Sequence, residues 1–223
     1  MISIVFPEVQ RCRYSYIVEI ALDGSSDSEV DDQSLKQDTS PSGSQLGTVV
    51  AIHGAPGSHK DFKYVTPLLQ DKGIRFIGVN MPGFGLTPVY NNIIGLRLDS
   101  GERAMMCVRT MSHLELAKGL QPKIDCINRS PDTRVLVAYS GKDFLIETSL
   151  SRELANSFKD HKELRSKDND EISEEKAVQQ TRELFSNGTK TVSINFEKCG
   201  HFLQRDRARY IADAIEALLR SRM

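Results

Sequence analysis

The chain has 223 residues, of which 39% are apolar, and this is enough to fill the core of one domain, so a small disulfide-stapled protein is excluded. Its 29 Lys and Arg residues balance 30 Asp and Glu residues, and the formal net charge of -1 leaves no overall field to attract nucleic acid or an anionic membrane. We therefore expect a single domain over residues 1–223, with binding confined to a local site.

The cysteines and the longest apolar runs indicate in which compartment we expect the protein. Cys12, Cys107, Cys126 and Cys199 form no C-x-x-C pair, so neither a metal site nor a disulfide framework is predicted. Nowhere do about 18 apolar residues follow one another, which argues against a membrane span. The start of the chain has no evident export signal. We expect a soluble, cytoplasmic protein.

The first elements in chain order are two strands. Residues 2–6 and 13–22 are rich in β-branched and aromatic types and predict a hairpin at a sheet edge. Residues 23–47 then turn to Ser, Asp, Gly and Gln with almost no large apolar side chain. Such a segment cannot bury enough surface to order itself, so we expect a disordered loop there.

A sharper pattern begins at residue 48. Residues 48–52 (TVVAI) form the short, continuous apolar run that is typical of a strand buried on both faces. A helix should follow, because Asp61 stands at a capping position and apolar residues recur at helical spacing until Gly73. Residues 74–79 form a second buried strand. Strand, helix and strand in this order predict a right-handed parallel crossover.

The middle of the chain is less regular. Residues 93–98 have the composition of a weak strand, and Asp99 with Glu102 resembles a helix-capping pair ahead of apolar residues that continue to Leu114.

Strand and helix alternate again after Pro131. We predict strands at 135–139 and 191–196, a charged, solvated helix or loop over 159–178, and a final amphipathic helix over 208–219. The helix after the first of these strands has an apolar stripe made of Leu150, Leu154 and Phe158. The whole pattern predicts an α/β fold, a mainly parallel sheet with helices on both faces.

Polar residues stand where a parallel sheet places its ligands, beyond the carboxyl ends of the strands. Asp143 follows one predicted strand and His201 follows the last. A carboxylate that accepts a hydrogen bond from one imidazole nitrogen fixes the tautomer, so the other nitrogen can take a proton from a nucleophile. We therefore predict Asp143 as the acid and His201 as the base. Glu147, one helical turn beyond Asp143, is the reserve acid.

The turn after residues 48–52 is predicted to stabilise an oxyanion rather than to supply an acid or a base. Next to Gly54, the backbone N–H of Ala55 is the candidate donor to an oxyanion. His53 is expected to be structural rather than a proton carrier. The remaining histidines, which show no partner spacing and receive no predicted role, are His59, His113 and His161.

Four stretches of the sequence resemble the α/β-hydrolase fold family, and in detail a poorly characterised nematode and flatworm branch. They read TVVAIHGAPGSHKDFKYVTPLL, IRFIGVNMPGFG, VLVAYSGKDFLIE and INFEKCGHFLQ, in the family's chain order. The resemblance implies a serine-hydrolase ancestry and a small-molecule substrate of ester, amide or epoxide type. It puts Asp143 in the acid position, His201 in the histidine position, and His53, Gly54 and Ala55 in the oxyanion loop.

The departure from the family lies between Asn80 and Val135. Family members place their nucleophile on a G-x-S-x-G elbow in this interval, and no such elbow is present. The interval holds 54 residues, too few for the strand, elbow, helix and further strand at roughly 30 residues for each βαβ unit. We expect a junction near residues 89–94, as in a shorter splice product or an incomplete gene model, and a sheet without its central strands.

The loss of central strands leaves two structural possibilities. If the halves of the sheet close up, the strand that contains Val49 pairs directly with the strand that contains Val135. If they do not, strand edges stay open.

Other hydroxyl and thiol groups are weaker candidates for the nucleophile. Ser100 lies in a possible strand-turn-helix, but a tight elbow needs small residues where Leu98 and Glu102 stand, so helix capping is the simpler role. Ser58 and Ser140 have the neighbours of turn residues. Cys199 fits a buried, small apolar side chain.

Two readings of function remain open at this point. One is a hydrolase of serine-hydrolase ancestry, weakened or inactive in this form, and the other is a non-catalytic relative that binds a ligand or a partner. Nucleotide binding is set aside, because residues 54–60 lack the spacing of a phosphate loop and the turn at Gly83 lacks the third glycine of a dinucleotide fingerprint. No pattern points to a metal, a cofactor or an oligomeric state.

Overall fold

A computed structural model describes residues 2–5, 20–22, 46–54, 58–79, 120–168 and 170–221. The strands are β1 Ile2–Val5, β2 Ile20–Leu22, β3 Gly47–Ile52, β4 Ile74–Val79, β5 Arg134–Ser140, β6 His161–Ser166 and β7 Thr191–Phe196. The helices are the 3-10 helix η1 His59–Phe62, then α1 Thr66–Gln70, α3 Gln121–Arg129, α4 Thr148–Asn156, α5 Glu171–Ser186, α6 Leu203–Asp206 and α7 Ala208–Arg220.

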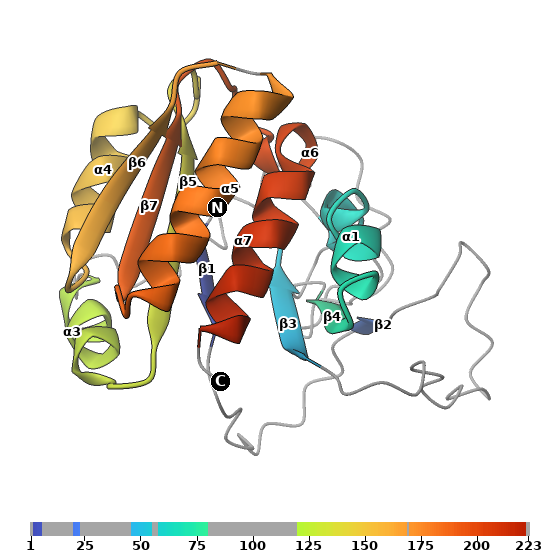
Figure 1. Cartoon of the computed structure of the whole chain (residues 1–223), viewed down its shortest axis with the longest axis horizontal. Coiled ribbons are helices and arrows are strands. Elements are labelled where there is room, and N and C mark those ends of the chain that lie inside the picture. Colours follow the sequence, from blue (N-terminus) through green and yellow to red (C-terminus); the bar gives the residue numbers. More distant parts are fainter. Residues whose placement is uncertain are drawn as a thin grey trace, which may run out of the picture.

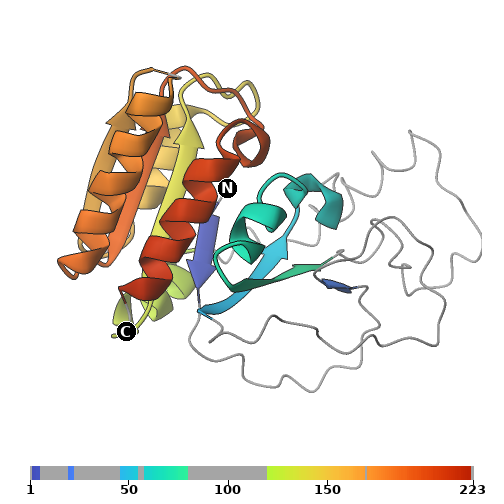
Figure 2. The same ribbon diagram turned by 45° about the vertical axis from the view of Figure 1, so that its right-hand side comes forward.

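The strands form two sheets (Figures 1 and 2). The larger sheet has the order β1-β5-β7-β6, and the smaller sheet has the order β2-β4-β3. β3 and β4 pair in parallel across η1 and α1, as the predicted crossover requires, and β5, β7 and β6 are also parallel. The expected α/β fold with mainly parallel strands is confirmed.

The predicted N-terminal hairpin is wrong. β1 pairs antiparallel with β5, where Ile2 lies opposite Val137, and β2 pairs antiparallel with β4, where Ile20 lies opposite Val79. The two apolar segments have the right strand composition, but each completes an edge of a different sheet. β1 also takes the side of β5 at which the strand containing Val49 was a possible partner, so that direct pairing does not form.

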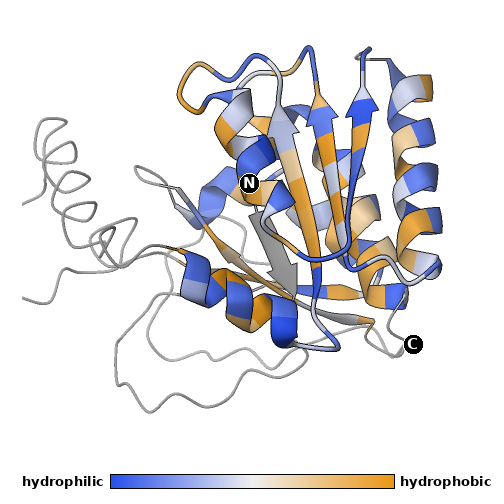
Figure 3. Ribbon diagram, turned by 90° about the vertical axis from the view of Figure 1, so that its left-hand side faces the viewer, coloured by the Kyte–Doolittle hydropathy of each residue, from blue (hydrophilic) through white to orange (hydrophobic). Residues whose placement is uncertain are grey.

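Helices cover both faces of the larger sheet. Alternate residues of β5 and β7 face α5 and α7, and their neighbours on β5 face α3 and α4. Figure 3 shows long hydrophobic stretches along these strands. A residue period of two explains the division: Leu136 and Ala138 belong to one core, and Val137 and Tyr139 belong to the other.

Helix α7 joins the two sheets. α7 buries eight apolar or aromatic side chains and lies between the larger sheet and the β3–α1 unit (Figure 2). Its Leu219 fits against Gly47 of β3 so closely that a Cβ atom at Gly47 would lie 3.0 Å from both terminal methyl carbons. Lys72, just after α1, completes the joint through ion pairs with Asp213 at 2.5 Å and Glu216 at 2.8 Å.

Two further expectations need correction. β3 is not buried on both faces, because Val50 and Ile52 are 48% and 64% exposed. Residues 159–178 are not one charged helix or loop, since they contain β6 and the start of α5. β6 escapes detection because it is an edge strand whose charged side chains pair with one another and with α4. The predicted loop at 23–47 lies outside the described residues up to position 45, and Gly47 belongs to β3.

Leu219→Ala should lower the free energy of unfolding by about 2–4 kcal/mol, because it leaves a void between α7 and β3. Hydrogen exchange should accelerate more in residues 47–52 than in β7. Ile172→Ala, at a side chain that is 82% exposed on α5, is the matched control and should have almost no effect. Equal acceleration in both sheets would contradict a joint formed by this side chain.

Candidate active site

The candidate site lies at the carboxyl ends of β5 and β7, which are neighbours in the larger sheet. The turn after β5 and the turn after β7 are bonded together through their backbones. Gly141 donates its N–H to the carbonyl of Phe196 at 2.9 Å, and Lys142 donates to the carbonyl of Cys199 at 3.0 Å. A Cβ atom at Gly141 would lie 2.5 Å from the carbonyl oxygen of Glu197, so only glycine permits this approach.

Ser140 adds a further bond between the two turns, whose connection is called the turn clamp below. Its hydroxyl is therefore not available as a nucleophile. Its hydroxyl, 3% exposed, donates to the carbonyl oxygen of Gly200 at 2.5 Å. Thr148, the first residue of α4, donates to the carbonyl of Ser140 at 3.1 Å. Each bond satisfies a backbone group at the end of a strand.

The clamp brings Asp143 and His201 together. Nδ1 of the imidazole lies 3.0 Å from both carboxylate oxygens of Asp143. Asp143 is itself held by the backbone N–H groups of Leu145 and Ile146, which donate to Oδ1 at 2.8 and 3.1 Å. Burial acts to raise the pKa of Asp143, but these backbone bonds and the imidazole outweigh it and leave the pKa lowered.

An ionised Asp143 fixes the tautomer of His201. The proton on Nδ1 points to the carboxylate, and Nε2 is left to accept a proton from another group. In the described part of the chain, Asp143 supplies the hydrogen bonds of this imidazole, and no serine, threonine or cysteine is bonded to Nε2. The side chain of His201 is 28% exposed.

Aromatic rings flank the imidazole. Phe144 lies with its ring centroid 5.7 Å from that of His201, and Phe202 meets the same imidazole edge-on at 5.3 Å. The exposed apolar side chains next to the pair, called the apolar rim below, are Phe144, Leu145, Ile146 and Phe202. Leu150, predicted on the buried stripe of α4, is also 56% exposed.

The predicted oxyanion loop is described only in part. His53 is buried, and its Nδ1 lies 2.6 Å from the carbonyl oxygen of Gly54, which agrees with a structural role. Gly54 is exposed, and Ala55 lies outside the described residues. η1, which follows this loop, contacts α6, which begins two residues after His201. The loop and the histidine therefore belong to the same region of the molecule.

The weaker candidates take other places. Glu147 is the exposed N-cap residue of α4 and accepts a bond from the hydroxyl of Ser149 at 3.2 Å, so Asp143 and not Glu147 contacts His201. Ser58 caps η1 by accepting the backbone N–H of Lys60. Cys199 is buried against the guanidinium of Arg207, whose Nε lies 3.2 Å from the sulfur. Ser100 lies outside the described residues.

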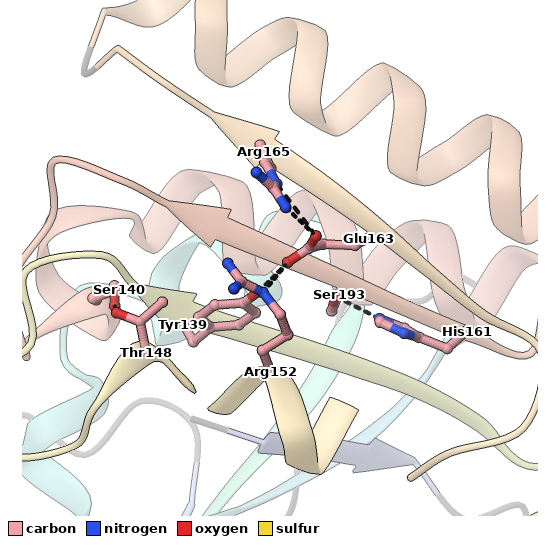
Figure 4. A network of polar contacts seen from close by, with 8 residues as sticks. All are labelled: Tyr139, Ser140, Thr148, Arg152, His161, Glu163, Arg165 and Ser193. Carbon is pink, nitrogen blue, oxygen red and sulfur yellow. Dashed lines mark hydrogen bonds and ion pairs between the residues drawn. The ribbon is translucent and has the colours of Figure 1, made fainter. Parts of the chain in front are cut away.

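A second polar cluster, which sequence reasoning missed, lies on the α4 side of the larger sheet (Figure 4). Glu163 of β6 accepts the hydroxyl of Tyr139 at 2.5 Å, Nε of Arg152 at 3.0 Å and Nη2 of Arg165 at 2.9 Å. Burial opposes ionisation, but these donors lower the pKa of Glu163 to about 2. Burial and the same carboxylate raise the pKa of Tyr139 to about 12.

The cluster includes a histidine–serine pair that is not a catalytic arrangement. Nε2 of His161 lies 2.7 Å from the hydroxyl oxygen of Ser193, and burial lowers the pKa of the imidazole. Ser193 is fully buried in the middle of β7, whereas a nucleophile needs an exposed turn at a strand end. The alternation of polar residues in HKELRS was the signal for this cluster, because every second side chain of a strand shares a face.

The candidate site is separate from the groove described next, and no metal site is found in the described ranges. A groove of about 580 Å³ is lined by Tyr64, Val178 and Arg209 among others, and neither Asp143 nor His201 lines it. Within the described ranges there is no cluster of three or more potential metal ligands. No helix in that part of the chain is long and apolar enough to cross a membrane.

These features define the class of the protein. A histidine–glycine turn after the first strand of a parallel crossover, with an acid and a histidine after two later neighbouring strands, is the arrangement of an α/β hydrolase. The chain belongs to the family described as alpha/beta hydrolase of unknown function (DUF1057), whose model matches residues 15–93 and 86–220.

A nematode relative agrees with the predicted branch. The uncharacterized protein F35H12.5 of Caenorhabditis elegans is 23% identical over 289 residues, which cover 81% of this chain and 80% of that protein. No solved structure matches the chain.

Gly141→Ala should destabilise the fold by about 2–4 kcal/mol, because the new methyl group overlaps the backbone at Glu197 and must push the two turns apart. Gly54→Ala is the matched control: no atom lies within 4 Å of its Cβ position, so thermal unfolding should hardly change. Equal melting temperatures for the two variants would show that the turns are not clamped.

Glu163→Gln should remove stability in a pH-dependent way. Because the folded pKa of about 2 lies below the ordinary value of 4.5, the carboxylate stabilises the fold fully above pH 4.5 and loses this contribution as the pH falls towards 2. The variant should be about 1–2 kcal/mol less stable at neutral pH, and the difference should vanish near pH 2. Chemical denaturation across this range measures it, with the exposed Glu175→Gln as control. A constant difference would contradict the assignment.

Proposed function

We propose that this chain is a serine-hydrolase relative that keeps the acid and the proton acceptor but lacks the serine they would activate. In this form it is weakened or inactive toward small ester, amide or epoxide-type substrates. The Asp143–His201 pair carries the proposal: Nδ1 is fixed by two contacts of 3.0 Å, while within the described residues Nε2 has no hydroxyl group bonded to it.

The way in which the chain matches its relatives supports a missing segment. The family model matches in two pieces that meet at residues 86–93, next to the junction expected at 89–94. The nematode alignment extends over 289 residues, whereas 81% of the 223 residues is only about 181, so about 108 aligned positions face no residue of this chain. Together, that number of positions is enough for a nucleophile elbow and the elements around it.

The edge of the larger sheet supports the same proposal. In the family's sheet the strands next to the acid strand carry and follow the nucleophile. Here β1 pairs antiparallel with β5 in that place, and β3 lies in a separate sheet. An antiparallel strand ends at the opposite edge, so it cannot present an elbow beside His201.

A non-catalytic binding role is the second candidate. The observation in its favour is the apolar rim, in which Phe144 and Leu145 are 75% and 65% exposed. Exposed apolar groups gathered at one place are typical of a binding surface.

A cytoplasmic location remains part of the proposal. Cys126 and Cys199 are free thiols in the structure, as expected in a reducing compartment.

Labelling with a fluorophosphonate probe tests the missing nucleophile. We expect no covalent adduct on the purified chain, because the probe reacts only with an activated serine. As a positive counterpart, the nematode segment that faces the gap is inserted between Val89 and Ile94. A folded chimera should acquire an adduct that is lost again on His201→Ala.

One result would overturn the proposal outright. If the unmodified chain forms an adduct on one serine, and Ser100→Ala or another single serine substitution abolishes it, the nucleophile is present.

A further inference from the structure

We propose that the Asp143–His201 pair acts as a general base on water, and that the apolar rim selects activated esters with an apolar acyl chain. This inference rests on the proposed function, since it describes what the pair does when no serine side chain intervenes. It concerns a direct hydrolysis without a covalent intermediate on the protein.

Asp143 determines which nitrogen of the imidazole carries the proton. Asp143 is ionised and holds the proton of Nδ1, so Nε2 presents a lone pair. His201 is 28% exposed, whereas a histidine that serves a buried serine is covered by it. Solvent therefore reaches the side chain of His201, and a positioned imidazole is an effective base near neutral pH.

The reaction that this imidazole supports is the attack of water on an ester. Nε2 takes a proton from water while the water oxygen bonds to the ester carbonyl carbon. The tetrahedral intermediate then breaks its bond to the alcohol or phenol oxygen, which receives the proton from the imidazolium. The products are a carboxylic acid and an alcohol or phenol, and the imidazole is regenerated. Asp143 stays ionised throughout and acts as a positioning residue that stabilises the imidazolium.

Two phenylalanine rings lie next to the imidazole. Phe144 and Phe202 contact the imidazole from two sides, with ring centroids at 5.7 and 5.3 Å. Phe202 is held in turn by the guanidinium of Arg205, which lies 5.4 Å from its ring centroid. A substrate that binds at the imidazole would lie next to the apolar rim to which these rings belong.

The rings set the class of substrate. Covering an exposed phenylalanine ring is favourable for an aliphatic or aromatic group and not for a charged one. An activated leaving group is needed, because no protein nucleophile or acyl-enzyme divides the barrier into two smaller steps. Aryl esters of medium-chain acids meet both conditions.

The test compares p-nitrophenyl acetate and p-nitrophenyl hexanoate at about pH 8, where a neutral imidazole accepts protons. The hexanoate should be hydrolysed faster than in buffer, and faster than the acetate relative to its own buffer rate. The enzymatic rate should be slower in D2O, because a proton moves in the rate-limiting step. His201→Gln, which keeps a polar contact to Asp143, should lower the rate at least about tenfold.

The rim is tested by Phe144→Ala and Phe202→Ala. Each should raise KM for the hexanoate roughly threefold to tenfold with little change in kcat, because the ring binds the acyl chain and takes no part in proton transfer. Ile172→Ala, at an exposed side chain of α5 outside the apolar rim, is the control and should leave both constants unchanged. Melting curves of all variants establish that they are folded.

The outcomes separate this inference from the proposed function. Turnover that survives His201→Gln, no turnover above buffer, or equal preference for acetate and hexanoate would each overturn the inference, although an absent fluorophosphonate adduct would still support the missing nucleophile. An adduct on a single serine would instead overturn the proposed function and, with it, the direct role of water.

Discussion

The packing of α7 against both sheets is the constraint on which the arrangement of this molecule depends. A parallel sheet that lost strands from its middle would leave two halves with no backbone hydrogen bonds between them. Here the two sheets share α7, which buries apolar side chains toward β5 and fits Leu219 against Gly47 of β3. The ion pairs of Lys72 with Asp213 and Glu216 fix the same joint at its polar rim. Hydrophobic burial therefore joins two sheets that share no strand pairing in the described part of the chain.

Chemistry in this chain follows from position at a strand end rather than from residue type. His201 and His161 each have a polar side-chain partner close by, and their surroundings differ. His201 lies on a turn, is oriented by an ionised carboxylate, and has a side chain that is 28% exposed. His161 lies within β6 and directs Nε2 at a serine that is sealed in the sheet. The turn clamp between Gly141 and Phe196 makes the difference, since it positions Asp143 next to the turn that holds His201.

Local patterns predicted the elements that are buried by their own side chains. β4, β7 and α7 lie where continuous apolar runs or helical spacing indicated, and Asp143 meets His201 as the order of strands and turns suggested. The failures share one cause, a dependence on partners that are distant in the sequence. β6 is a strand because β7 pairs with it and Arg152 of α4 binds its Glu163, and the polar alternation of HKELRS indicates a shared face but neither of these partners. β1 has the composition for a hairpin, but only the open side of β5 decides its true partner.

The exposed apolar side chains of β3 have a consequence for the amount of this protein in a cell. Parallel strands are normally covered by helices on both faces, yet β3 exposes Val50 and Ile52. Apolar strand residues at a surface are what chaperones and proteases capture, and a strand with exposed apolar side chains opens at small cost in free energy. The quantity of this protein that accumulates would then be set by how rapidly quality control captures it, as much as by how rapidly ribosomes make it.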